Sequence, residues 1–138
     1  MMRFQKTTEY AIRVMVHLAE NMDQRLSARI LSDKLDIPYK YLGRLMSKLA
    51  HAGLVDVEKG TAGGYRIIHD LDSIYLYQIA DLVEGLEDYE RCILGFQECS
   101  DENSCSLHDH WVKPRKIVKN MLYQTTLLDL QKKSQDQP

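Results

Sequence analysis

Residues 27–66 read SARILSDKLDIPYKYLGRLMSKLAHAGLVDVEKGTAGGYR, and this stretch decides the fold. Ser27 has a side chain suited to cap a helix, and the residues after it predict a short helix over 28–35. Pro38 favours the start of a second helix, because its missing N–H would be unpaired there in any case. This second helix is predicted over 39–51, where three leucines and a methionine recur at helical spacing.

A glycine-rich hairpin is predicted directly after these two helices. Gly53 ends the second helix, as glycines in a left-handed conformation commonly do. Short strands over 54–58 and 65–68 flank a tip at 59–64 that reads KGTAGG. Two short helices joined by a tight turn and followed by a hairpin are typical of a winged helix-turn-helix.

The rest of the chain is predicted to be mostly helical, so the fold class is mostly α. Thr8 is expected to cap a helix that runs to Glu20, and a further short helix is expected over 74–86. A last helix, expected to reach about Leu130, either begins at Pro114 or is kinked there.

Charge is distributed unevenly along the chain. The formal net charge is −2, but residues 25–69 carry eight Lys and Arg against four Asp and Glu. Residues 81–109 carry nine acidic residues against Arg91 alone. The basic first half favours contact with a polyanion, whereas the acidic middle indicates a second task.

The N-terminal region does not read as a secretory signal or a membrane span. Its longest apolar run, at residues 14–16, is far shorter than the roughly 18 apolar residues that a span needs. We therefore expect a cytoplasmic protein with no membrane partner, in a compartment that keeps thiols reduced.

The helix over 39–51 carries the candidate DNA-reading face. No acid occurs between residues 37 and 55, and the face opposite the leucines holds basic side chains. Lys and Arg can meet phosphates, and Arg44 could pair with a guanine edge of double-stranded DNA. The alternative is a solvated basic face on an ordinary helical domain. The candidate DNA-binding residues are Arg3, Ala28, Tyr39, Lys40, Tyr41, Gly43, Arg44, Lys48, Lys59 and Thr61.

All three cysteines of the chain, Cys92, Cys99 and Cys105, lie in one polar, loop-like stretch. Thiolate and imidazole are soft ligands for zinc, copper(I) or iron–sulfur clusters, and His108 follows the last cysteine by three residues. The gaps of six and five residues exceed those of usual zinc sites, and they suit a loop that wraps around a cluster. A zinc site, a disulfide switch and buried structural thiols stay open as alternatives.

Three stretches of the chain resemble the IscR/NsrR regulators of the bacterial Rrf2 family, which are winged-helix, iron–sulfur-sensing transcription factors. They read MRFQKTTEYAIRVMVHLA at the N-terminus, DKLDIPYKYLGRLMSKLAHAGLVDVEKGTAGGYRI through the helices and hairpin, and CILGFQECSDENSCSLHDHW in the cysteine loop. The resemblance covers residues 2–132.

The resemblance implies a set of cofactor ligands. Cys92, Cys99 and Cys105 would hold an iron–sulfur cluster, either 2Fe–2S or 4Fe–4S. The fourth ligand would be His108, as in IscR-like members, or Glu9 from the partner chain, as in NsrR-like members. Both residues are present, so the sequence does not decide between these two branches.

The resemblance also implies a homodimer in which the last helix crosses between protomers. The residues expected to cross are Trp111, Val118, Met121, Leu122 and Leu128. The expected organisation is a winged helix-turn-helix domain at 1–85, a cluster-binding loop at 86–108, a dimerisation helix at 109–132 and a disordered tail at 133–138.

The function implied by the resemblance is transcription regulation and not enzyme catalysis. Operator binding would be controlled by the iron–sulfur cluster, in response to redox state, nitric oxide or iron–sulfur status. The alternatives are a winged-helix regulator that holds zinc or switches by thiol chemistry, and an iron–sulfur electron-transfer or carrier protein.

Overall fold

The computed structural model describes residues 3–97 and 99–134, and it is mostly helical with one two-stranded sheet. None of the helices in these ranges is long and apolar enough to cross a membrane. The elements, in order, are α1 (Lys6–Glu20), α2 (Ala28–Leu35), α3 (Tyr39–His51), β1 (Asp56–Glu58), β2 (Gly64–Arg66), a 3-10 turn η1 (Leu71–Ser73), α4 (Leu76–Val83), a 3-10 turn η2 (Glu87–Tyr89), α5 (His108–Gln124) and α6 (Leu127–Ser134).

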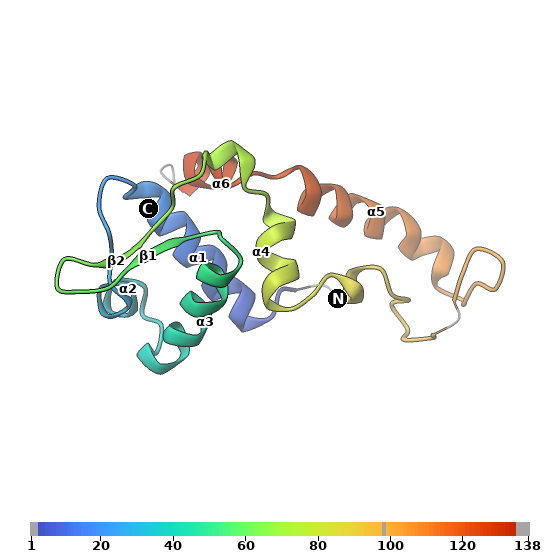
Figure 1. The fold of residues 1–138 in the computed structure, drawn as a ribbon. Helices are drawn as coiled ribbons and strands as arrows, with labels where there is room; N and C mark the ends of the chain where they lie inside the picture. The colour runs from blue at the N-terminus through green and yellow to red at the C-terminus, as the bar shows by residue number, and fades with distance from the viewer. Residues whose placement is uncertain (1–2, 98, 135–138) are drawn as a thin grey trace.

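The arrangement in space separates two ends of the molecule. One end is a body in which α1, α2, α3, α4 and α6 lie together and from which the β1–β2 hairpin projects (Figure 1). From the other side of this body α5 extends outward, and the loop that carries the cysteines lies at its far end (Figure 1). The hairpin and the cysteine loop therefore point in opposite directions.

The helix-turn-helix forms as its sequence predicts. The Ser27 side chain caps α2 by accepting a hydrogen bond of 3.2 Å from the N–H of Ile30. Pro38 stands at the N-cap of α3, and Gly53 follows its end with a positive φ of 77°. The N–H groups of Gly53 and Leu54 bond to carbonyls of the last helical turn, which closes the helix in a Schellman motif.

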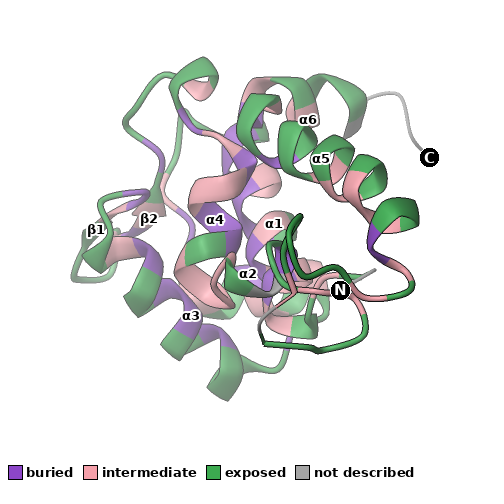
Figure 2. Cartoon of the chain, turned by 90° about the vertical axis from the view of Figure 1, so that its right-hand side faces the viewer, coloured by how far each residue is buried: buried purple, intermediate pink, exposed green. Residues whose placement is uncertain are grey.

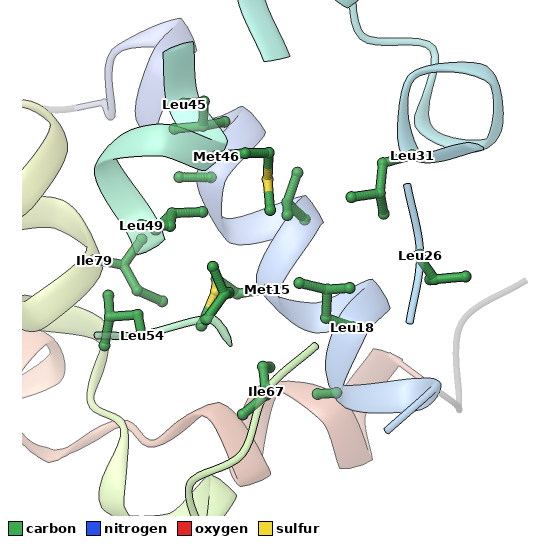
Figure 3. Packing of buried hydrophobic residues seen from close by; sticks show 14 of the residues in the cluster. Met15, Leu18, Leu26, Leu31, Leu45, Met46, Leu49, Leu54, Ile67 and Ile79 are labelled. Atoms are coloured by element: carbon green, nitrogen blue, oxygen red, sulfur yellow. The ribbon is translucent and has the colours of Figure 1, made fainter. Parts of the chain in front are cut away.

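The core lies between α1 and α3, with α2, α4, α6 and the hairpin around it. Figure 3 shows Met15 and Leu18 of α1 in one cluster with Leu45, Met46 and Leu49 of α3. All of these side chains, and Leu42 of the same helix, are almost completely buried. The predicted leucine stripe of α3 is therefore confirmed. Burial of one such side chain contributes about 1.5–3 kcal/mol, so this packing fixes the angle at which the outer face of α3 is presented.

The first helix begins earlier than its sequence predicts. Thr8 does not cap it, because α1 already begins at Lys6 and Thr8 lies inside it. Thr8 is completely buried, and its hydroxyl oxygen has no hydrogen-bond partner among the described residues. The N-cap residue is Gln5, whose side chain makes no capping bond. Packing against the rest of the body thus decides where α1 begins, in place of a capping side chain.

The hairpin has the predicted antiparallel pairing but shorter strands. Asp56 pairs with Arg66 and Glu58 with Gly64. Leu54 was expected at the start of the first strand, but its N–H is used to close α3. Ile67 was expected inside the second strand, but it is buried in the core beyond the ladder.

The C-terminal region forms two helices, so the prediction of one continuous helix is wrong. The chain becomes extended at Thr125, and Thr126 forms an isolated bridge with Tyr75. Thr126 and Asp129 then exchange hydrogen bonds of 3.0 and 3.2 Å that start α6. Because of this break, α6 turns back and packs against α1. Pro114 neither begins nor ends α5, and it lies inside that helix.

Candidate metal centre and nucleic-acid interface

The thiols of the three cysteines converge in the loop before α5. The Sγ atoms of Cys92, Cys99 and Cys105 all lie within 4.8 Å of one another, and each residue is partly buried. The Cys92 and Cys105 sulfurs are 3.3 Å apart, and the N–H of Cys105 donates to the Cys99 sulfur over 3.4 Å. A loop without regular structure thus gathers all the soft ligands that the sequence singles out.

An open hollow of about 710 Å³ lies beside the Cys99 and Cys105 thiols. Its lining residues are Gly95, Phe96, Gln97, Cys99, Asn103, Ser104 and Cys105. Gly95 has a positive φ of 84°, which turns the loop between the first two cysteines. The donor set and the adjacent space therefore fit a thiolate-held metal group.

His108 joins this group from the first residue of α5. The side chain is only 8% exposed, and its Nδ1 lies 3.4 Å from the Cys99 sulfur. Its Nε2 lies 2.9 Å from a carboxylate oxygen of Asp101. Of the two fourth ligands expected from the sequence, His108 is therefore the one that lies beside the thiols within the chain.

Glu9 is engaged elsewhere in the same chain. It accepts a hydrogen bond of 3.2 Å from Arg3 and forms an ion pair of 3.5 Å with Lys6. The hydrogen bond from Arg3 lowers the pKa of the Glu9 carboxyl, so this group is a stable anion. The start of α1 lies apart from the cysteine loop in Figure 1.

The thiols differ in how easily they lose a proton. Partial burial disfavours the Cys92 thiolate, but hydrogen bonds from the Phe96 N–H and the Cys105 thiol outweigh it and lower the pKa of Cys92 to about 7. The N–H of Cys105 favours a thiolate at Cys99, but burial and the neighbouring thiols outweigh it and raise the pKa of Cys99. Of these two thiols, Cys92 is therefore the readier thiolate ligand, whereas the Cys99 thiol lies where it can share its proton with His108.

The outer face of α3 is basic and open to solvent. Tyr39 is 54% exposed, and the guanidinium of Arg29 from α2 lies 5.1 Å from the centre of its ring. Tyr41 contacts the ring of Tyr10 edge-on and bonds to Thr7, both from α1. The other predicted residues of this face are also exposed, and they are Lys40, Gly43, Arg44 and Lys48.

The remaining predicted DNA-binding residues fall into three places. Lys59 and Thr61 are exposed at the tip of the hairpin. Ala28 is half-buried at the start of α2. Arg3 is 80% exposed but paired with Glu9. The structure thus brings the α3 residues together on one face and leaves Arg3 apart, before α1.

Arg25, which the sequence counts among the basic residues, has a structural task. It forms ion pairs of 2.6 Å with Asp56 and 2.9 Å with Glu58, and its side chain is 15% exposed. It also donates to the backbone carbonyls of Asp56 and Gly64. These bonds hold the hairpin to the segment before α2, so the charge of Arg25 is not free for DNA.

Sequence reasoning missed two further residues of these two sites, Arg29 and Asp101, and one exposed residue of α5, Ile117. Arg29 lies beside Tyr39 only because of the angle between α2 and α3, and Asp101 reaches His108 only through the loop path. Ile117 lies outside both sites and is 68% exposed on α5, although an apolar side chain ordinarily favours burial. Its position outside the apolar stripe of the predicted last helix was the one sequence signal for this exposure.

A winged helix-turn-helix with an exposed basic recognition helix defines a class, the winged-helix DNA-binding proteins. Residues 4–133 match the Rrf2 family, described as an iron-dependent transcriptional regulator. The chain belongs to this family, and it is a DNA-binding transcriptional regulator and not an enzyme. The family and fold expected from the sequence are therefore confirmed.

Individual relatives support the same assignment. The HTH-type transcriptional regulator IscR of Vibrio campbellii is 30% identical over 132 residues, which cover 95% of this chain and 78% of that protein. CymR, the global cysteine regulator of B. subtilis, has a solved structure with a TM-score of 0.79 at 26% identity, covering 96% and 98% of the two chains. The structure of T. potens IscR has a TM-score of 0.74 at 22% identity, covering 96% and 88%, and it supports the fold.

Proposed function

We propose that the chain is a regulator whose DNA binding depends on an iron–sulfur cluster held by Cys92, Cys99 and Cys105. The convergence of their three sulfurs within 4.8 Å is the observation that carries this proposal. Similarity to IscR proteins along most of the chain supports it further. When bound, the group would supply a centre that responds to redox state, nitric oxide or iron supply.

His108 is the fourth ligand that we favour. Its Nδ1 already lies beside the Cys99 sulfur, whereas Glu9 is bound to Arg3 and Lys6 in its own chain. A partner chain's Glu9 would first have to break both of these ion pairs. Imidazole is also a weaker ligand for iron than thiolate, which makes this position the easiest one to exchange.

The cysteine loop would pass its state to the rest of the protein through α4 and α5. The loop joins these two helices, and Tyr89, just before the loop, packs with Leu76 and Ala80 of α4 and Leu122 of α5. A polar loop has little apolar contact of its own, so its order depends on what its thiols hold. We infer that loss of this order changes the angle between α4 and α5.

The exposed face of α3 would read double-stranded DNA, with the hairpin beside it. Lys40 and Lys48 would meet phosphates, and Arg44 would reach base edges in the major groove. Tyr39, Tyr41, Gly43 and Ala28 would form the surrounding contact surface, and Lys59, Thr61 and Arg3 would contact the flanking backbone.

A homodimer would place two such faces on one operator. Ile117 and Met121 are 68% and 44% exposed on α5, and Figure 2 shows this helix nearly free of buried residues. An apolar face of this kind on a regulator favours self-association about a two-fold axis. The two recognition helices would then reach half-sites about 34 Å apart.

One observation favours a second candidate, a regulator that holds a single zinc ion. Sulfurs bound to one tetrahedral ion at about 2.3 Å lie roughly 3.8 Å apart. The observed range, from 3.3 Å to within 4.8 Å, includes this spacing. With His108 the donor set would be three thiolates and one imidazole, which is a common structural zinc set.

One experiment separates these candidates. The protein is purified without oxygen, and its absorption spectrum is recorded together with iron, sulfide and zinc contents. The proposed function predicts a brown protein with iron and sulfide and a salt-dependent affinity for DNA that changes when the cluster is removed. A colourless protein with one zinc per chain would support the second candidate, and identical DNA binding with and without the cluster would contradict the first.

A further inference from the structure

His108 has both of its ring nitrogens engaged, although its side chain is only 8% exposed. Nδ1 faces the Cys99 sulfur at 3.4 Å, and Nε2 faces a carboxylate oxygen of Asp101 at 2.9 Å. The ring is therefore held between the thiol group on one side and a carboxylate on the other.

An ionised carboxylate accepts hydrogen bonds and has no proton to donate. In a neutral imidazole, the nitrogen beside Asp101 must therefore carry the proton, which leaves a lone pair on Nδ1. A metal-bound histidine typically donates its other N–H to a carboxylate or carbonyl, which fixes the tautomer and the orientation of the ring. The arrangement of Asp101, His108 and the thiols follows this pattern.

We propose that Asp101 is the positioning residue of the metal centre. Its carboxylate accepts the Nε2–H of His108 and thereby presents Nδ1 to the metal group, so that all four ligands come from one chain. This inference rests on the proposed function, and it holds equally for a cluster and for a single zinc ion, because both need a free Nδ1 lone pair.

The loop around Asp101 is built to hold it in place. Ser100 and Asn103 exchange two hydrogen bonds of 3.2 Å, from the Ser100 N–H to the Asn103 carbonyl and from the Asn103 N–H to the Ser100 hydroxyl. Asp101 lies inside the turn that these bonds close. Its side chain is 93% exposed, so a substitution there leaves no hole in the core.

The test uses two substitutions at this position and one matched control. Asp101→Ala removes the acceptor, whereas Asp101→Asn removes the charge but keeps an oxygen that can accept the Nε2–H. Glu102→Gln removes one charge from a neighbouring exposed residue. Comparison of the three variants separates orientation of His108 from the general effect of charge on the loop.

The first measurement is made on the cluster-free protein. Long-range ¹H–¹⁵N NMR spectra report which ring nitrogen of a histidine carries the proton. We expect the Nε2–H form of His108 in the wild type, in Asp101→Asn and in Glu102→Gln, and a mixture of both forms in Asp101→Ala. A proton on Nδ1 in the wild type would overturn the inference.

The second measurement is the rate at which the loaded protein loses metal to a chelator. Removal of such a supporting carboxylate typically weakens metal affinity about 10- to 100-fold. We expect metal loss from Asp101→Ala to be faster by this factor, while Asp101→Asn and Glu102→Gln stay close to the wild type. If Asp101→Ala matches Glu102→Gln, the inference fails although the proposed function stands. If the wild type holds neither iron and sulfide nor zinc after reconstitution, both fail together.

Discussion

Arg44 and Lys48 share the exposed face of α3, but we expect different tasks for them. Arginine can pair with a guanine through two hydrogen bonds, whereas lysine meets phosphates as a point charge. Arg44→Ala should cost about 1–3 kcal/mol on the preferred operator and relax the sequence preference. Lys48→Ala should weaken binding to all duplexes alike. It should also reduce the slope of log affinity against log salt concentration by about one.

Fluorescence anisotropy at several salt concentrations, with an operator selected from random duplexes, measures both effects. Asp23→Asn serves as the control, because Asp23 is exposed in the segment after α1 and outside the predicted DNA-binding set. An unchanged sequence preference in Arg44→Ala would show that Arg44 does not read a base.

Two glycines should respond in opposite ways to the same substitution. Gly64 has a positive φ of 142°, and an added Cβ would lie 2.7 Å from the backbone carbonyl of Leu26. Gly64→Ala should therefore destabilise the fold by about 1–3 kcal/mol or more. Gly43 lies in the open middle of α3, where an added Cβ meets nothing within 4 Å. Gly43→Ala should stabilise the helix by roughly 0.5–1 kcal/mol.

Urea unfolding of the two alanine variants measures this contrast. Gly43→Ala is the matched control, because it adds the same methyl group at an open helical position. Equal stability of both variants would mean that the hairpin does not pack closely against the segment before α2.

Among the elements, α6 depends on a cap formed by Thr126 and Asp129, which have capping-box spacing in the sequence but were not predicted as a helix start. The Thr126 N–H donates to the Asp129 carboxylate, and the Thr126 hydroxyl oxygen accepts from the Asp129 N–H. The first of these bonds is the main reason that the pKa of the Asp129 carboxyl is lowered. Thr126→Ala should therefore cost about 1 kcal/mol of stability, as the loss of an N-cap typically does. Circular dichroism during urea unfolding measures this cost, and Thr125→Ala is a control one residue away.

The same cap predicts how stability changes with pH. A carboxyl group whose folded pKa lies below its ordinary value of 3.8 stabilises the fold fully above that value. This contribution is lost as the pH falls through the folded pKa. The difference in unfolding free energy between the wild type and Asp129→Ala should thus be constant above roughly pH 5 and shrink in stronger acid. A constant difference down to pH 2 would contradict the assignment of this cap.

The elements also show which parts of the fold were predictable from the sequence. The helix-turn-helix was predictable because Ser27, Pro38 and Gly53 act through local backbone chemistry. The start of α1 was not, because it depends on packing between distant segments. The start of α6 had a local signal in the capping-box spacing of Thr126 and Asp129, which the prediction of one continuous helix overlooked. Thr8 is buried by packing, and Thr126 is placed by its bridge to Tyr75.

The candidate site divides in the same way. Three cysteines and a histidine at short spacing were recognisable as soft ligands from residue type alone. The contribution of Asp101 was not recognisable, because an exposed acid in an acidic loop has no periodic or compositional mark. The expected crossing of Leu122 to a partner was wrong, because Leu122 is 1% exposed and lies with Leu76 of α4 in its own chain.

For the whole molecule, the proposed homodimer depends on the exposed side of α5. Ile117→Glu would put a charge into the proposed apolar contact between protomers, where it could not be hydrated. We expect this variant to dissociate at least about tenfold more readily and to bind a two-half-site operator more weakly. Light scattering after size exclusion gives the mass, and Asn120→Glu, on an exposed position of the same helix, is the control. A wild-type monomer, or a dimeric Ile117→Glu, would exclude this surface.

The two ends of α5 are held very differently. Its C-terminal end is fixed by the Tyr75–Thr126 bridge and by the stacked rings of Tyr77 and Tyr123, which are 4.5 Å apart. Toward its other end, Trp111 and Arg115 donate to the backbone carbonyls of Arg91 and Glu90, and Lys119 forms an exposed ion pair of 2.9 Å with Glu90. The helix α5 is about 25 Å long, is anchored in the body at its C-terminal end, and carries the cysteine loop at its N-terminal end. A tilt of about ten degrees at the C-terminal end of α5 moves its N-terminal end by roughly 4 Å. Insertions or deletions in the cysteine loop should therefore leave α3 and the hairpin in place. A single substitution in the stacked pair of Tyr77 and Tyr123, which holds the C-terminal end of α5, should instead displace the cysteine loop.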